Sequence, residues 1–205
     1  MTKFIAIAGN MGAGKTTMVR YLHQTYGITP VYEPFMDNPY LDDFYGDMKR
    51  WAFHSQMYFL THKFRLHMDL PLGSSHNTIV LDRSIYEDAE IFCRNLYRSK
   101  NIPQRDFETY MELYETMQKA IQPPDLMIYL RCSVRTIKKR IQQRNRENEQ
   151  NIPTKYIRNL NKLYEEWIGN YQFSPVLIWD SDNMDYISDL MHRIEFHETI
   201  QKVLE

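Results

Sequence analysis

A glycine-rich octapeptide, GNMGAGKT at residues 9–16, separates a short apolar run from a stretch of helical composition. It satisfies the GxxxxGKS/T pattern, in which glycines allow backbone N–H groups to turn toward phosphate oxygens. The run at residues 3–8 predicts a strand, and residues 15–26 predict a helix whose N-terminus adds partial positive charge. Strand, loop and helix in this order predict a binding site for a nucleoside triphosphate. Its predicted ligands are Gly9, Asn10, Met11, Gly12, Ala13, Gly14, Lys15, Thr16 and Thr17.

Three polar side chains in or near this loop have chemistry suited to a bound triphosphate. Lys15 is expected to reach the β- and γ-phosphates, and the Thr16 hydroxyl suits Mg²⁺. Asp82 ends the apolar run TIVLD and matches the pattern in which a strand-end carboxylate holds Mg²⁺, directly or through water. A merely solvated aspartate is the alternative, which the phosphate loop disfavours. The predicted cofactor is therefore Mg²⁺, held by Thr16 and Asp82.

Short apolar runs alternate with helical stretches along the rest of the chain. The runs lie at residues 3–8, 30–32, 78–81, 126–130 and 176–179. One or two helices are expected within residues 41–70, and further helices at 84–98, 104–121, 133–145, 153–170 and 184–203. This order predicts an α/β fold with a five-stranded parallel sheet flanked by helices. Ligands of such sheets bind beyond the carboxyl ends of the strands, where Gly9, Glu33 and Asp82 fall.

Length and composition limit the classes of partner. A chain of 205 residues with 43% hydrophobic residues is expected to form one domain over residues 1–205. The formal net charge of −1 argues against a nucleic-acid polymer as the main partner. Cys93 and Cys132 stand far apart, which favours reduced thiols and a cytoplasmic location. No apolar run approaches the length of a membrane span, so no membrane association is expected.

Basic residues gather between Arg131 and Arg146. Arg140, Arg144 and Arg146 lead into a polar stretch and predict a mobile lid at about residues 140–152. Arginines that close over a transferring phosphoryl group stabilise its spread charge and exclude water. They are therefore predicted to contact ATP, and we interpret the other basic residues of this helix as a solvated face.

Several strings, in order, resemble the deoxyribonucleoside kinase family, which includes deoxycytidine, deoxyguanosine and deoxyadenosine kinases. The resemblance covers nearly the whole chain. It implies a P-loop kinase fold and ATP-dependent phosphorylation of the 5′-hydroxyl of a deoxyribonucleoside, with both substrates small molecules. The strings are GNMGAGKT, EP at Glu33, NPYLDDFY, WAFHSQ, DRSIYED, IFCRNLY and RIQQRNRENEQNIP.

The resemblance also implies roles for individual residues. Glu33, which alone would be read as part of a turn before Pro34, becomes the base for the 5′-hydroxyl. Arg83 is implied to lie beside it and to bridge toward the transferred phosphate, as the third catalytic group with Lys15. Tyr45 and Glu149 match the family pair that holds the sugar 3′-hydroxyl. The implied contacts to the nucleobase are Gln56, Asp88 and Phe92.

The base preference depends mainly on Gln56, because a carboxamide can pair with the N1/N6 edge of adenine or the N3/N4 edge of cytosine. Several family members carry an arginine paired to the aspartate at the position of Asp88. Here that arginine is replaced by Lys63, with Arg65 nearby, and lysine is a point charge rather than a planar fork. Deoxyadenosine is the first expectation, after bacterial relatives of similar appearance, and deoxyguanosine and deoxycytidine follow.

Two alternatives remain at this point. A thymidylate kinase-like nucleoside monophosphate kinase would share the phosphate loop, the DR string and the arginine lid, but it gives no reason for Gln56 or Glu33. A nucleotide-binding subunit that activates a partner kinase is disfavoured by the complete set of Lys15, Glu33, Asp82 and Arg83. Since such kinases are often dimers in this family, a homodimer or a heterodimer with a related kinase is expected.

Overall fold

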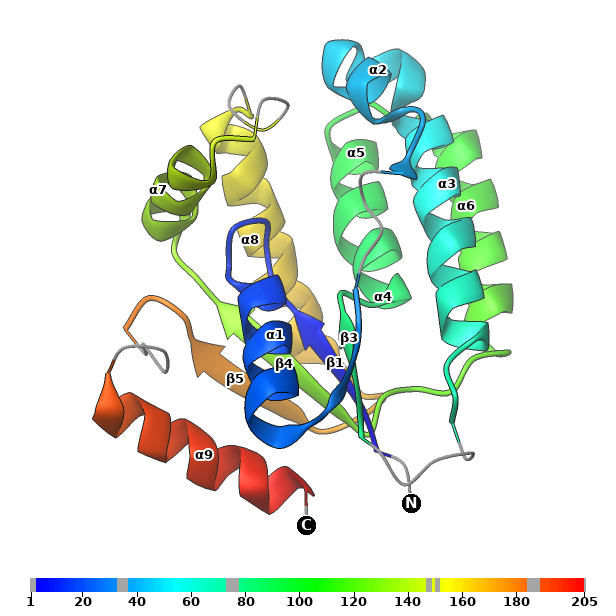
Figure 1. The fold of residues 1–205 in the computed structure, drawn as a ribbon. Helices are drawn as coiled ribbons and strands as arrows, with labels where there is room; N and C mark the ends of the chain where they lie inside the picture. The colour runs from blue at the N-terminus through cyan, green and yellow to red at the C-terminus, as the bar shows by residue number, and fades with distance from the viewer. Residues whose placement is uncertain are drawn as a thin grey trace.

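The computed structural model describes residues 3–32, 37–72, 78–146, 149, 152–183 and 189–204. Its centre is a five-stranded, fully parallel sheet of order β2-β3-β1-β4-β5 (Figure 1). This arrangement confirms the predicted fold class, and each strand lies within about a residue of its apolar run, because buried parallel strands are apolar along their whole length. The strands are β1 Phe4–Ala8, β2 Thr29–Val31, β3 Ile79–Asp82, β4 Leu126–Arg131 and β5 Val176–Asp180.

Helices connect the strands and cover both faces of the sheet (Figure 1). The segment predicted at 41–70 is two helices, which meet at Asp47, where the aspartate side chain accepts a hydrogen bond from Arg50 N. The helix predicted at 84–98 contains a π-helical turn. Within the described residues no helix is long and apolar enough to cross a membrane. The helices are α1 Lys15–Tyr26, α2 Leu41–Gly46, α3 Met48–Met68, α4 Ile85–Glu87, π-helix η2 Asp88–Cys93, α5 Arg94–Arg98, α6 Gln104–Gln118, α7 Val134–Arg144, α8 Thr154–Asn170 and α9 Leu190–Leu204.

The central strand β1 is completely buried and separates two apolar clusters. Ile5 and Ile7 pack with residues of α1, α7 and α9 on one face. Ala6 and Ala8 point to the other face and pack with residues of α3, η2, α5, α6 and α8. Because side chains alternate along a strand, the small alanines allow this second group of helices to approach the sheet closely.

The register of β1 and β3 fixes the geometry of the edge at which both strands end. Ile7 lies opposite Asp82, and Arg83 N donates to Ile7 O at 3.1 Å just beyond the last strand pair. The loop that follows β1 and the turn that follows β3 therefore leave the sheet side by side. This places the glycine-rich loop next to Asp82 and Arg83, as the sequence predicted.

Candidate active site

The loop between β1 and α1 is tightly packed against its neighbours. Gly9 has a φ of 153°, and a Cβ at this position would lie 3.0 Å from Leu130 O. Gly12 has a φ of 73°, a left-handed conformation that favours glycine. Lys15 is buried, and its ammonium donates to Gly9 O at 2.8 Å and to Asn10 O at 3.1 Å. The backbone of the loop thus curves around the Lys15 ammonium, which is the conformation typical of a phosphate-binding loop.

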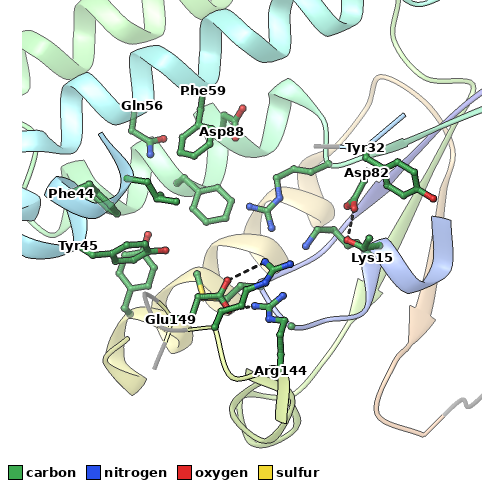
Figure 2. A pocket seen from close by; sticks show the side chains of 18 residues that line it. Lys15, Tyr32, Phe44, Tyr45, Gln56, Phe59, Asp82, Asp88, Arg144 and Glu149 are labelled. Carbon is green, nitrogen blue, oxygen red and sulfur yellow. Dashed lines mark hydrogen bonds and ion pairs between the residues drawn. The ribbon is translucent and has the colours of Figure 1, made fainter. Parts of the chain in front are cut away.

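A possible metal site lies where α1 begins. Thr16 Oγ1 donates to Asp82 Oδ2 at 2.5 Å (Figure 2). Asp82 is buried, and its Oδ1 has no hydrogen-bond partner in the part of the chain that the structure describes. A buried carboxylate oxygen without a partner is costly, and together with a hydroxyl it suits a hard cation such as Mg²⁺. Thr16 and Asp82 therefore fit the predicted ion.

A cavity of about 330 Å³ opens above this pair (Figure 2). It brings together side chains from α1, α2, α3, the turn after β3, η2 and the lid. Of the residues predicted from the sequence, the lining includes Met11, Gly12, Lys15, Thr16, Tyr45, Gln56, Asp82, Arg83, Asp88, Phe92, Arg144, Arg146 and Glu149. What each of them binds stays a prediction. Lining residues that the sequence did not single out are Tyr32, Leu41, Phe44, Phe59 and Tyr156.

Across the cavity from Lys15 and Asp82 lies a group of side chains suited to a nucleobase (Figure 2). Gln56 is 4% exposed, and its Oε1 finds no hydrogen-bond partner among the described residues. Asp88 is also buried and begins the π-helical turn, four residues before Phe92. Leaving a buried carbonyl oxygen without a donor costs about 1–3 kcal/mol, so Gln56 is poised to accept from a ligand.

Lys63 is 2% exposed and does not line the cavity. Its ammonium donates to Arg83 O at 2.8 Å and to Asp82 O at 3.4 Å. Arg65 is exposed and does not line the cavity. Of the two candidates to replace the family arginine, Lys63 is therefore the one inside the protein, where it holds the turn after β3.

The lid contributes Glu149, which is 6% exposed although it follows a polar stretch. Its carboxylate accepts from Arg144 and lies 3.5 Å from Arg146, so two lid arginines converge on one anion. Tyr156, at the start of α8, faces the same space, and burial raises its pKa above the usual value. Tyr45, Tyr156 and Glu149 thus form one polar part of the cavity lining.

The structure places Arg140 apart from the other two lid arginines. It does not line the cavity, and its guanidinium donates to Ala13 O at 3.0 Å, Ser181 Oγ at 2.9 Å and Ser181 O at 2.8 Å. These bonds tie the back of the phosphate loop to the segment after β5. That Arg140 contacts ATP stays a prediction, and such a contact would lie outside the cavity lining.

Glu33 lies outside the described residues, and its role as the base stays a prediction. Tyr32, the last described residue before it, lines the cavity. Arg83 has a backbone φ of 68°, and its guanidinium carbon lies 4.5 Å from the centroid of the Phe92 ring. Arg83 and Phe92 are thus in contact inside the cavity, one from each side of α4.

Glu87, which no sequence pattern singled out, is fully buried beside the phosphate loop. Its Oε1 accepts from Gly9 N at 3.1 Å, and its Oε2 accepts from Ser84 N at 3.0 Å. The Tyr164 hydroxyl lies 2.8 Å from Oε1, and burial together with the Glu87 charge raises the pKa of Tyr164 well above its usual value. The string DRSIYED contains Glu87, but a charged residue in a helical stretch gives no signal of burial.

Comparison with known proteins identifies the chain. The family model described as deoxynucleoside kinase matches residues 5–205. The deoxyadenosine/deoxycytidine kinase of Bacillus subtilis is 35% identical, over 90% of this chain and 85% of the relative. The deoxyguanosine kinase of Lactobacillus johnsonii is also 35% identical, over 98% of this chain and 92% of the relative.

Solved structures agree with these relatives. A deoxyadenosine kinase from M. mycoides with bound dCTP superposes with a TM-score of 0.83, at 31% identity, over 98% of this chain and 99% of the other. The same enzyme with bound dATP gives an equal TM-score. These likenesses do not favour the thymidylate kinase-like alternative. The chain therefore belongs to the deoxynucleoside kinase family, and it is an enzyme that phosphorylates the 5′-hydroxyl of deoxynucleosides.

Proposed function

We propose that this enzyme transfers the γ-phosphoryl group of ATP, with Mg²⁺, to deoxyadenosine first, and to deoxyguanosine and deoxycytidine as further substrates. The observation that carries the proposal is a cavity with Lys15 and Thr16 at one end and, at the other, the Gln56 oxygen, which has no partner among the described residues. A nucleoside placed there would point its sugar toward the phosphate loop. The names of the relatives, which include deoxyadenosine kinases, support adenine as the first base.

The chemistry of Gln56 supports adenine and cytosine directly. Its buried oxygen can accept a hydrogen bond from an exocyclic amino group, while its amide nitrogen donates one to the adjacent ring nitrogen. Asp88 offers a second acceptor from η2, and Phe92 offers an aromatic face for stacking. A guanine would require the amide to turn over, so that its nitrogen donates to O6 and its oxygen accepts from N1–H.

For the sugar we propose that Tyr45 and Glu149 hold the 3′-hydroxyl and that Glu33 accepts the proton of the 5′-hydroxyl. Arg83 lines the cavity beside the phosphate loop, a position from which it would stabilise the transferred group. Arg144 and Arg146, which both pair with Glu149, would contact the transferred phosphoryl group from the lid. Catalysis would thus rest on positioning and on charge.

Thr16 and Asp82 would hold Mg²⁺, with phosphate oxygens and water completing its ligands, since Mg²⁺ is usually bound by one or two carboxylates plus substrate phosphates. The ion would neutralise charge between the β- and γ-phosphates. In the part of the chain that the structure describes, no group of three or more His, Cys, Asp or Glu side chains could form a cage for a metal. The residues present therefore suit a magnesium ion that is shared with its nucleotide.

The test is a substrate panel. Consumption of ATP is measured with each natural deoxynucleoside and ribonucleoside, and with dAMP and dTMP, in wild-type protein and in Gln56→Ala. We expect the highest kcat/KM for deoxyadenosine and a loss of about tenfold or more in Gln56→Ala. Turnover of the monophosphates alone would refute the proposal, and a wild-type preference for thymidine would refute the proposed role of Gln56.

We further propose that the enzyme works in the cytoplasm, as one domain, and as a homodimer or a heterodimer with a related kinase. The buried, unpaired thiols of Cys93 and Cys132 support a reducing compartment. The formal net charge of −1 supports small-molecule substrates in place of a nucleic-acid polymer. Light scattering coupled to gel filtration measures the oligomeric state, and a mass of one chain at micromolar concentration would refute the homodimer.

A further inference from the structure

Glu87 joins three elements of the active-site edge through one buried carboxylate. Gly9 lies in the phosphate loop, Ser84 is the N-cap of α4, and Tyr164 lies in α8, and all three place a donor at its oxygens. A carboxylate is stable inside a protein only when such donors compensate for the lost water. Its position is therefore fixed from three directions, although it does not itself line the cavity.

The cation that pairs with this carboxylate is Arg83, four residues earlier in the turn that precedes α4. Arg83 Nε lies 3.9 Å from Glu87 Oε1, and the Arg83 side chain is only 12% exposed. A terminal nitrogen of the Arg83 guanidinium donates to Gly9 O at 3.4 Å. The face of the guanidinium lies over the Phe92 ring. Glu87 thus supplies an ion-pair contact on the Nε side, which acts together with Gly9 O and the Phe92 ring on the plane of the guanidinium.

The backbone of Arg83 is held independently of its side chain. Its N–H donates to Ile7 O, its carbonyl accepts from Lys63, and its φ of 68° is a conformation that residues other than glycine rarely adopt. A main chain held at both ends sets where the side chain begins but not how its plane is turned. The direction of the guanidinium therefore depends on the groups around it.

We propose that Glu87 is a positioning residue, which turns the Arg83 guanidinium toward the phosphoryl group and holds it against the phosphate loop. This inference rests on the proposed function, in which Arg83 stabilises the transferred group. Because that charge develops in the transition state, losing the orientation should lower kcat and leave the KM values for ATP and deoxynucleoside almost unchanged.

The first experiment compares Glu87→Gln with Glu90→Gln, a matched change on the same helical segment. Glu90 pairs with Arg94, is partly exposed and does not line the cavity. We expect kcat to fall about tenfold or more in Glu87→Gln and to stay within about twofold of wild type in Glu90→Gln. The rates are taken well below each melting temperature and are divided by the number of ATP sites found by calorimetry, so that a loss of folded protein does not count.

The second experiment asks whether Glu87 acts through Arg83. Arg83→Lys keeps the positive charge and removes the Nε group that faces Glu87. If Glu87 works by orienting that group, Arg83→Lys combined with Glu87→Gln will have the kcat of Arg83→Lys alone, within about twofold. Independent, multiplying losses would overturn the proposal, as would a higher KM for ATP with unchanged kcat, which would mean that Glu87 only shapes the loop.

If Glu87→Gln does not fold, the same cycle is run with Glu87→Asp, which keeps the charge and withdraws it by one methylene. Its kcat is expected to fall about threefold or more, and a kcat equal to wild type would overturn the proposal. The wild-type rate separates this inference from the proposed function. Wild type that phosphorylates no deoxynucleoside refutes both, whereas active wild type with an equally active Glu87→Gln refutes only the role of Glu87.

Discussion

The Thr16 hydroxyl donates to Asp82 Oδ2 over 2.5 Å and so joins the first turn of α1 to the end of β3. The second oxygen of Asp82 is buried without a partner among the described residues. Two elements that are far apart in the sequence thus present a hydroxyl and a carboxylate to one point. Mg²⁺ would satisfy the unpartnered oxygen.

Asp82→Asn should make the enzyme depend on a higher magnesium concentration, because an amide neutralises the only proposed anionic ligand. We expect the magnesium concentration for half-maximal activity to rise about tenfold or more. Titration of activity with MgCl₂ measures it, and Asp106→Asn, in the first turn of α6 and outside the cavity lining, is the control. The same magnesium midpoint in Asp82→Asn and wild type would contradict the proposed site.

Glu33→Gln should lower kcat by about a hundredfold or more, because the amide cannot accept the proton of the 5′-hydroxyl. ATP binding should stay within about threefold of wild type, since Glu33 is proposed to face the acceptor. Turnover is measured with deoxyadenosine, and ATP binding by calorimetry without nucleoside. Unchanged turnover would remove Glu33 from the mechanism.

Gln56→Leu should separate stability from function. The change removes a buried oxygen that has no partner among the described residues and replaces it with apolar volume, so the melting temperature should stay equal or rise. The KM for deoxyadenosine should nevertheless rise about tenfold or more, because the base loses its amide. Thermal unfolding and initial rates measure the two effects. A lower melting temperature with unchanged KM would mean that Gln56 serves the fold alone.

The stability of the protein should fall as the pH drops from about 6.5 toward 3, owing to His67. Burial, and secondarily the nearby Lys63, lowers the pKa of His67 from 6.5 to about 3, while its Nε2 accepts from Ile85 N. Between these two pKa values the unfolded chain binds a proton at His67 and the folded chain does not. The contribution of His67 to the free energy of unfolding is therefore fully present above pH 6.5 and is lost as the pH falls. Between pH 7 and 5 this amounts to about 2 kcal/mol.

Denaturant unfolding of wild type and His67→Gln at both pH values tests this assignment. The glutamine can accept the hydrogen bond from Ile85 N but does not titrate. Its loss of stability on acidification should therefore be smaller by about 2 kcal/mol. Equal losses in the two proteins would assign the effect to other groups.

How far the sequence predicts this molecule depends on the range of the interactions involved. The strands follow from continuous apolar runs, and the site edge follows from the rule that parallel strands present their carboxyl ends together. Glu87 could not be predicted, because its burial depends on donors from Gly9 and Tyr164, which are remote in sequence. Arg140 and Arg144 lie on one helix, but Arg140 binds Ala13 O of the phosphate loop and Arg144 lines the cavity. This difference arises from tertiary contacts that the sequence pattern does not show.

The π-helical turn Asp88–Cys93 is another feature beyond the sequence pattern, which predicts a regular helix at 84–98. A π turn widens the helix by one residue and is favoured only where tertiary contacts compensate for it. Here it carries Asp88 and Phe92 into the cavity lining. The resemblance to the family could name these two residues, but not the backbone geometry that presents them.

Discrimination at the sugar should depend on Glu149. If its carboxylate and Tyr45 hold the 3′-hydroxyl, wild type should prefer deoxyadenosine over 2′,3′-dideoxyadenosine by about a hundredfold in kcat/KM, since a site built for a hydroxyl rejects an analogue without one. Glu149→Gln should reduce that ratio to about tenfold or less. The variant also weakens the anchor of Arg144 and Arg146, which lowers kcat for both nucleosides alike. The ratio of the two substrates therefore isolates the contact to the sugar, and a ratio equal to that of wild type would show that Glu149 serves only to gather the lid arginines.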